Sequence, residues 1–216
     1  MKKRADKLLF ELGLFESRKK AQVAIKKQIV KMKVDGVIKT VAKVADEIDA
    51  DLVEDWIIGS HPELDYVSRS GFKLAGAIKE FKVDVQGCSC LDVGLSTGGF
   101  SECLLRFGAD WVLGVDVGTN QLHPSMKERP ELISFDKVNG RDPLPEHVLE
   151  LFFQKSSRRS FDLIVIDVSF ISVVPIIEAQ LELLAPRGML LALVKPQFEV
   201  GKDKIRKKGL VAGEEG

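Results

Sequence analysis

Charged side chains that follow short apolar runs are the best candidates for chemistry in this chain. Asp116 and Asp167 each end an apolar run, and Lys195 directly follows another. Parallel strands end at one edge of a sheet, and open α/β sheets bind their ligands at that edge. We therefore expect Asp167 and Lys195 to face one crevice, with Asp116 beside them.

Lys73 is a second lysine that could join this crevice, because it lies in a predicted helix just before the first strand. Two lysines near one carboxylate disfavour each other's charge. A lysine that loses its proton can act as a general base toward a hydroxyl group, with the carboxylate orienting it. The alternatives are a structural ion pair between Asp167 and Lys195, and a surface role for Lys73.

A glycine-rich loop follows the first predicted strand of this sheet. Residues 90–101 read CLDVGLSTGGFS, where Asp92 stands near the end of the strand and Gly94, Gly98 and Gly99 precede a helix. Glycine lets a ligand or a neighbouring backbone come close, and the start of a helix offers free N–H groups. The loop lacks the Lys-Ser/Thr of a P-loop and the spacing of the NAD motif. A plain tight turn is the alternative.

The pattern Asp-x-Gly-x-x-x-Gly-Gly resembles the first motif of S-adenosylmethionine methyltransferases. S-adenosylmethionine carries a sulfonium cation and an amino group, so nearby carboxylates suit it. An acid at the end of the next strand, about 20 residues after the loop, is where Rossmann-like folds hold ribose hydroxyls. The resemblance implies cofactor contacts from Asp92, Gly94, Ser96, Gly98, Gly99, Asp116 and Asn139.

The start of the chain is basic, although the whole chain has no net charge. Residues 2–33 contain eleven Lys or Arg and three Asp or Glu, an excess of eight positive charges. Such a block on a structured segment is typical of proteins that bind polyanions. A protein-binding surface is the alternative.

Local patterns predict a small α+β unit here. Apolar spacing indicates a helix over residues 4–13, and Ser17 is a good N-cap for a second helix. Asp35-Gly36 predicts a hairpin between two strands. Pro62 and its neighbours interrupt both the helical and the strand periodicity of the apolar residues, so we place a domain boundary near residue 60.

This unit, residues 1–60, resembles the S4 RNA-binding domain. The matching positions are Arg4, Asp6, Gly13, Ser17, Arg18, Ala21, Ile25 and residues 30–36. Gln28 stands where that family usually has glycine, and Asp35 stands where it often has asparagine. The resemblance implies that basic side chains contact RNA phosphates, namely Arg4, Arg18, Lys19, Lys20, Lys26 and Lys27.

Residues 61–216 alternate between strand and helix patterns four times. This alternation predicts a doubly wound, Rossmann-like parallel sheet of the methyltransferase type. No run approaches the ~18 apolar residues of a membrane span. Three cysteines favour reduced thiols and a cytoplasmic protein. Cys88 and Cys90 lack a second pair, so no metal site is expected.

Taken together, the motifs resemble the TlyA family, proteins often called haemolysins that join an S4 domain to an FtsJ-like rRNA ribose 2′-O-methyltransferase. The motifs that carry the resemblance are residues 68–74, 91–100, 115–118, 167–172 and 194–199. The family's Lys-Asp-Lys-Glu pattern corresponds here to Lys73, Asp167 and Lys195. The family's Glu and the last strands of the sheet are expected beyond the end of the chain. Glu214 and Glu215, in a glycine-rich stretch, are poor candidates for that Glu.

The resemblance implies an S-adenosylmethionine-dependent enzyme acting on ribosomal RNA or a ribosomal subunit. Lys195 would take the 2′-hydroxyl proton, Asp167 would position Lys195, and Lys73 would stabilise developing negative charge. Two departures stand out: Ser70 replaces a usual glycine, and Leu95 replaces a small residue and could crowd the cofactor. A membrane-active haemolysin and a protein that binds the cofactor and RNA without turnover are the alternatives.

Overall fold

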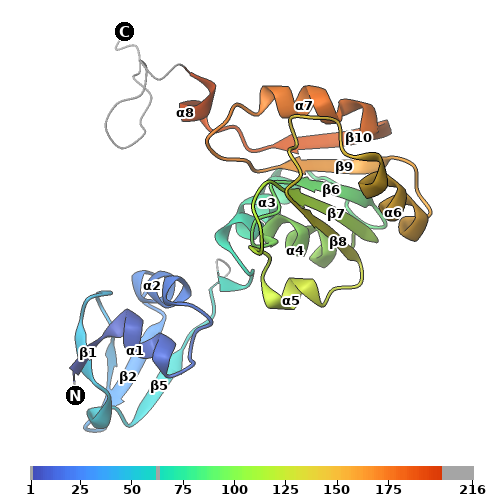
Figure 1. The fold of residues 1–216 in the computed structure, drawn as a ribbon. Helices are drawn as coiled ribbons and strands as arrows, with labels where there is room; N and C mark the ends of the chain where they lie inside the picture. The colour runs from blue at the N-terminus through green and yellow to red at the C-terminus, as the bar shows by residue number, and fades with distance from the viewer. Residues whose placement is uncertain (1, 62–63, 201–216) are drawn as a thin grey trace. The chain divides into compact units, whose positions relative to one another are not determined.

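The computed structural model describes residues 2–61 and 64–200 and divides the chain into two compact units (Figure 1). The first unit ends at Tyr66 and the second begins at Val67. This division falls slightly later in the chain than the predicted boundary near residue 60.

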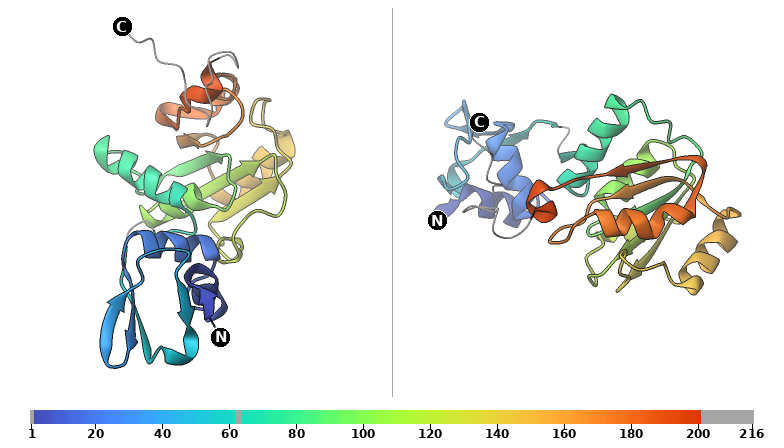
Figure 2. Two further views of the ribbon diagram at one scale, coloured as in Figure 1. Left: turned by 90° about the vertical axis from the view of Figure 1, so that its left-hand side faces the viewer. Right: turned by 90° about the horizontal axis from the view of Figure 1, so that it is seen from above.

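The N-terminal unit packs two helices against short antiparallel strands (Figure 2). Its core is made by apolar residues from both helices and from the first strand of a three-stranded sheet, including Leu9, Ile25 and Val30. The elements are β1 (Lys2–Arg4), α1 (Ala5–Glu11), α2 (Arg18–Lys26), β2 (Val30–Val34), β3 (Val37–Thr40), β4 (Glu47–Asp49), the 3-10 helix η1 (Ala50–Leu52) and β5 (Asp55–Ile58).

Two local predictions for this unit are confirmed. The hydroxyl oxygen of Ser17 accepts a hydrogen bond from the backbone N–H of Lys20 at 3.2 Å and so caps α2. Asp35 and Gly36 have φ angles of 52° and 74°, as a tight hairpin turn with two left-handed residues requires. The turn joins β2 to β3 in antiparallel register.

The second unit contains the predicted parallel sheet. In the described residues it has five strands in the order β10-β9-β6-β7-β8, and all neighbouring strands run parallel. The strands are β6 (Ser89–Val93), β7 (Trp111–Asp116), β8 (Leu132–Asp136), β9 (Phe161–Ile166) and β10 (Leu184–Ala192). The helices are α3 (Arg69–Glu80), α4 (Gly99–Arg106), α5 (Pro124–Lys127), α6 (Glu146–Ser156), α7 (Val174–Gln180), the 3-10 helix η3 (Leu181–Leu183) and α8 (Pro196–Glu199).

Helices cover both faces of this sheet (Figures 1 and 2). Alternate residues of β6 point to opposite faces. Leu91 and Val93 join a core with Phe152 of α6 and Ile176 of α7. The other face of the sheet is covered by α3 and α4, which pack closely on each other. The doubly wound arrangement predicted from the sequence is therefore present.

Two details of this unit concern the ends of its elements. Val148, Phe152 and Ser156 form a buried helical stripe, and α6 extends to Ser156. Strand β10 begins at Leu184, and its pairing with β9 shifts in register between Leu184 and Met189.

Gln28 provides a test of the backbone in the N-terminal unit. It follows α2 with a φ angle of 56°, a left-handed conformation that costs L-residues roughly 1–2 kcal/mol and is usually taken by glycine at a helix end. We expect Gln28→Gly to raise the free energy of unfolding by about 1 kcal/mol in denaturant titrations. Lys27→Gly, one residue earlier at a φ of −83°, should lower it instead. A loss of stability in Gln28→Gly would contradict this reading of the helix end.

Candidate active site

The candidate site lies where the strand order reverses. Strands β6 and β9 are neighbours in the sheet although two other strands and several helices separate them in the chain. Open α/β sheets bind ligands outside the carboxyl ends of the strands at such a point. Asp92 and Gly94 come from the end of β6, and Asp167 directly follows β9.

Gly94 allows the ends of these two strands to come together. Its φ angle is +94°, and a Cβ atom at this position would lie 2.6 Å from the carbonyl oxygen of Asp167. The N–H of Asp167 donates to the carbonyl of Val93 at 3.1 Å. The structure thus explains this glycine by the approach of a neighbouring backbone, one of the two reasons considered from the sequence.

Asp92 is a fully buried acid beneath the loop. One of its oxygens, Oδ2, accepts a hydrogen bond from the hydroxyl of Ser101 in α4 at 2.7 Å, while Oδ1 is buried and has no partner. Burial raises the pKa of Asp92 to about 7; the Ser101 hydrogen bonds oppose this, and the negative charges of Asp167 and Asp116 add to it. The charges of Asp116 and Asp167 thus act on the buried Asp92 at this edge.

Asp116 fixes the loop from the end of β7. Its Oδ2 accepts the N–H of Ser96 at 2.7 Å, and its Oδ1 accepts the N–H of Gly118 at 2.7 Å. Each carboxylate oxygen has more than one acceptor position, so further hydroxyl donors can still bind. Asp116 and Ser96, both predicted as cofactor contacts, are thus brought together.

Lys195 and Asp167 meet as the sequence predicts. Nζ of Lys195 lies 2.6 Å from Oδ1 of Asp167, and both side chains are mostly buried, with 19% and 13% exposed. The contact is an ion pair rather than a well-aligned hydrogen bond, because this Oδ1 has no hydrogen-bond partner. The ammonium donates to the carbonyl of Val168 at 2.7 Å and to the hydroxyl of Ser169 at 2.8 Å.

Lys73 does not join this pair. Its side chain is exposed on α3, and within residues 2–61 and 64–200 it forms no ion pair with Asp167. Of the three charged side chains predicted to meet, Asp167 and Lys195 therefore do so and Lys73 does not. The start of α3 nevertheless packs against the loop, because a Cβ at Gly99 would collide with the hydroxyls of Ser68 and Ser70.

Two residues that depart from the family pattern fit the packing. Leu95 is 3% exposed and lies over Gly114 of β7, where a Cβ would come within 2.7 Å of its Cδ1. The side chain of Leu95 therefore fills the space that Gly114 leaves beside the loop. The hydroxyl of Ser70 lies 2.6 Å from that of Ser68, the N-cap residue of α3, and neither caps a backbone N–H of the helix.

Asn139 lies in an exposed loop after β8, held to the site by its neighbours. The N–H of Val138 donates to the carbonyl of Asp116 at 2.9 Å, and the side chain of Asn139 donates to Asp142 at 2.8 Å. Gln180 of α7 is buried and donates to the carbonyls of Gly140 and Asp142. Gln180 carried no signal in the sequence, because a buried glutamine looks like any polar residue near a helix end.

Phe170 and Glu199 are two further residues at this edge; both lie in motifs that carry the resemblance, but neither was predicted as a site residue. Phe170 has a φ angle of +71°, is 87% exposed, and contacts the ring of Phe198 at a centroid distance of 5.5 Å. Residues held in sparsely populated backbone conformations cluster at functional sites. Glu199 accepts hydrogen bonds from Ser172 and Val173. Glu214 and Glu215 lie outside the described residues.

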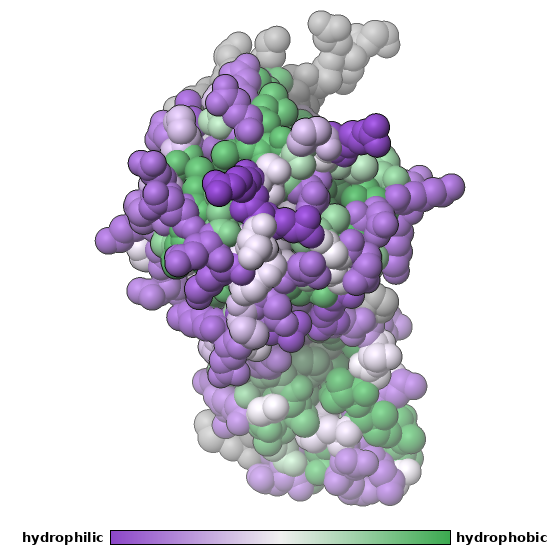
Figure 3. Space-filling view, turned by 90° about the vertical axis from the view of Figure 1, so that its right-hand side faces the viewer, coloured by the Kyte–Doolittle hydropathy of each residue, from purple (hydrophilic) through white to green (hydrophobic). Residues whose placement is uncertain are grey.

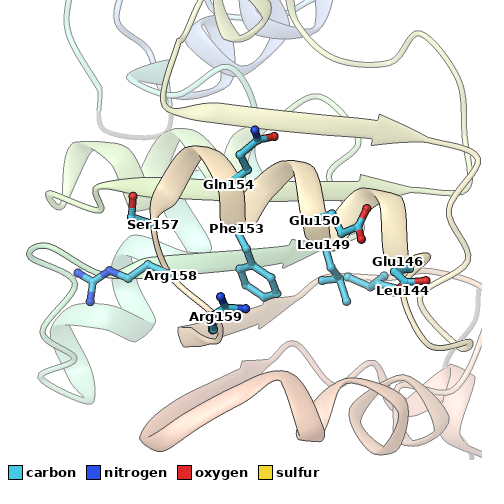
Figure 4. A pocket seen from close by; sticks show the side chains of 9 residues that line it. All are labelled: Leu144, Glu146, Leu149, Glu150, Phe153, Gln154, Ser157, Arg158 and Arg159. Atoms are coloured by element: carbon cyan, nitrogen blue, oxygen red, sulfur yellow. The ribbon is translucent and has the colours of Figure 1, made fainter.

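A separate groove lies along α6 in this unit (Figure 4). Its volume is about 650 Å³, and its lining includes Leu149, Phe153, Arg158 and Arg159. It contains none of the predicted site residues. The convergence of charged groups therefore identifies the candidate site.

In the N-terminal unit, a buried acid holds two of the predicted RNA-binding residues. Asp6 accepts hydrogen bonds from Arg4 at 3.2 Å, Arg18 at 2.8 Å and Gln22 at 2.7 Å. Burial opposes the charge of Asp6, but the hydrogen bonds from Gln22, Arg18 and Arg4 outweigh it and lower its pKa to about 2. Both arginine side chains remain about half exposed, at 52% and 48%.

The predicted lysines of α2 and its end differ in their surroundings. Lys20 is paired with Glu16 at 2.6 Å, while Lys19, Lys26 and Lys27 are exposed. The surface of this unit also shows apolar patches (Figure 3), and Ile38, Leu52 and Ile57 are among its exposed large side chains. A basic surface and an apolar surface thus coexist on one small unit.

Comparison with known proteins adds a family to this geometry. The FtsJ-like methyltransferase family matches residues 66–213. A Bacillus subtilis protein provisionally named the rRNA methyltransferase YqxC is 40% identical over 210 residues, which cover 97% of this chain and 69% of that protein. The 16S/23S rRNA (cytidine-2′-O)-methyltransferase TlyA of Mycobacterium tuberculosis is 36% identical over 210 residues, 96% of this chain and 72% of that protein.

A solved structure is also similar to this chain. A Streptococcus thermophilus protein, provisionally named a hemolysin, superposes with a TM-score of 0.65 at 34% identity, covering 98% of this chain and 72% of that one. Over residues 2–61 and 64–200, none of the helices combines the length and the apolar character needed to cross a membrane.

Asp92 provides a pH test of the site. Its folded pKa of about 7 lies above the ordinary value of 3.8, so its ionisation opposes folding. Stability should therefore fall as pH rises from about 4 to about 7 and then level off with respect to this group. We expect Asp92→Asn to remove most of this fall, measured by thermal unfolding without ligand. Asp110→Asn, at an exposed acid, should keep it, and an unchanged pH profile in Asp92→Asn would exclude Asp92 as its source.

Proposed function

The chain belongs to the FtsJ-like methyltransferase family, and we propose that it transfers a methyl group from S-adenosylmethionine to a ribose 2′-hydroxyl of ribosomal RNA. The observation that carries this proposal is the Lys195–Asp167 ion pair at the switch point of the sheet. The named activity of the Mycobacterium tuberculosis relative, 2′-O-methylation of cytidine in rRNA, supports the choice of substrate.

The residues at the switch point suit a cationic cofactor. Asp92 presents a buried oxygen without a partner, and Asp116 and Asp167 add negative charge around it. We propose that Asp116 receives the ribose hydroxyls, that the loop of Gly94, Ser96, Gly98 and Gly99 follows the amino-acid part, and that Asn139 borders the adenine. When bound, S-adenosylmethionine supplies the methyl group, whose bond to sulfur breaks as its bond to the 2′-oxygen forms.

Lys195 is the proposed base for the 2′-hydroxyl proton. Its nitrogen is held by two hydrogen bonds, to Val168 and Ser169, and by the ion pair with Asp167, with all three oxygens within 2.8 Å. Asp167 holds Lys195 in place, and Lys73 is proposed to reach the developing negative charge from α3. Positioning of this kind can supply much of the reduction in the barrier.

The proposed RNA contacts combine bases and phosphates. An exposed aromatic ring such as Phe170 can stack on an unpaired base. The N-terminal unit, proposed as an S4-like RNA-binding domain, offers phosphate contacts from basic side chains, namely Arg4, Arg18, Lys19, Lys20, Lys26 and Lys27. We propose that the substrate is ribosomal RNA or a ribosomal subunit and that the protein works in the cytoplasm.

The catalytic proposal predicts a large loss of methyl transfer from single substitutions. Lys195→Ala and Asp167→Ala should each reduce the transfer of labelled methyl groups to ribosomal RNA by about a hundredfold or more, the usual contribution of a general base. Lys155→Ala, at an exposed lysine of α6, is the matched control and should retain full activity.

Calorimetry of S-adenosylmethionine binding, measured beside methyl transfer, distinguishes loss of catalysis from loss of cofactor binding. Unchanged turnover in both variants would refute the proposed roles of Lys195 and Asp167. Binding of S-adenosylmethionine by the unaltered protein without any methyl transfer would favour the alternative of a cofactor- and RNA-binding protein without turnover.

The RNA proposal predicts a change in salt dependence. Lys19→Ala and Lys26→Ala should weaken binding of ribosomal RNA, and each should reduce the slope of log K against log salt by about 1 if its lysine neutralises one phosphate. Filter binding over a series of salt concentrations measures this slope. Lys79→Ala, at an exposed lysine of α3, should leave the slope as it is. Equal slopes in all three variants would place the RNA-binding surface elsewhere.

A further inference from the structure

Two loops at the edge of the sheet are fastened to each other at two points. One loop, residues 167–173, leads from β9 to α7, and the other segment, residues 195–199, follows β10. At the first point, Lys195 binds Asp167, Val168 and Ser169. At the second point, Glu199 binds the far end of the same loop.

Glu199 makes the second fastening with both carboxylate oxygens. The hydroxyl of Ser172 donates to Oε2 at 2.6 Å, and the backbone N–H of Val173 donates to Oε1 at 2.9 Å. Val173 is 3% exposed, so its N–H would lose its partner away from solvent if Glu199 were removed. Hydrogen bonds to an ionised carboxylate are stronger than those between neutral groups.

The segment that carries Lys195 has little other support. It forms α8, a helix of four residues, whose own backbone bonds cannot make it rigid. In the described part of the chain, the side-chain hydrogen bonds of this segment are those of Lys195 and Glu199. Between these two residues, the ring of Phe198 contacts the ring of Phe170. Removal of Glu199 would therefore leave Lys195 as the main polar tie.

We propose that Glu199 is a positioning residue that keeps Lys195 against Asp167 by fixing segment 195–199 to the loop after β9. The catalytic consequence rests on the proposed methyl transfer, in which Lys195 is the base. Glu199 itself acts through Lys195 and does not contact the reacting atoms.

The test compares the reactivity of Lys195 toward an amine-specific acylating reagent, followed by peptide mass spectrometry on the full chain. Lys195 should acylate slowly in the unaltered protein, because its nitrogen is held by three oxygens. Glu199→Ala should raise the rate several-fold, and Ser172→Ala, which removes one of the two hydrogen bonds, should raise it less. Glu199→Gln keeps an acceptor for Val173 and should stay near the original rate. Glu178→Ala, at an exposed glutamate of α7, is the control.

Methyl transfer gives the second readout. In Glu199→Ala, kcat should fall by between about tenfold and a hundredfold, the usual cost of a misplaced catalytic group, while the affinity for S-adenosylmethionine stays the same. Glu199→Gln should restore most of kcat, which a general loss of folding would not allow. If Glu199→Ala does not fold, Ser172→Ala carries the same comparison.

Acylation of Lys195 at the original rate in both Glu199→Ala and Ser172→Ala would overturn the proposal. A protein that transfers no methyl group to ribosomal RNA would overturn the proposed function alone, because the acylation rates still decide whether Glu199 positions Lys195.

Discussion

Negative charge accumulates where strands β6, β7 and β9 end, and the arrangement of the site follows from how that charge is compensated. Asp92 is buried with one oxygen unpaired, Asp116 is satisfied by backbone N–H groups, and Asp167 is paired with Lys195. Removing charges from water is costly unless they are paired or hydrogen-bonded. The charges of Asp116 and Asp167 and the unpaired oxygen of Asp92, set against the ammonium group of Lys195, leave room for a further cation. S-adenosylmethionine is a cation at its sulfur, which distinguishes it from nucleotide phosphates.

Close packing of the backbone brings these groups together. Gly94 lets the turn after β6 touch the residue after β9, and Gly99 lets the start of α3 rest on α4. The loops after β9 and β10 are then joined by side chains of opposite charge, Lys195 at one end and Glu199 at the other. The site is thus held by contacts between segments that are distant in the chain, and small changes far from the chemistry can displace it.

The sequence revealed those parts of the structure that depend on local patterns. Apolar runs ending in Asp116 and Asp167 predicted the strands, their parallel arrangement and the shared edge, because these follow from local periodicity and from the alternation of strand and helix along the chain. Side-chain orientation and long-range contacts were less accessible. The sequence could not show that Lys73 is exposed, that Gly114 makes room for Leu95, or that Glu199 binds Ser172, since each depends on two segments meeting in three dimensions.

The most direct measurement is a map of 2′-O-methylated riboses in ribosomal RNA from cells with and without this protein, obtained by mass spectrometry of nuclease fragments. The account predicts that at least one 2′-O-methyl ribose disappears when the protein is absent and returns when the unaltered chain is restored, but not when the Lys195→Ala chain is restored. Identical maps in all of these cells, or a missing methyl group that belongs to a base rather than a ribose, would contradict it.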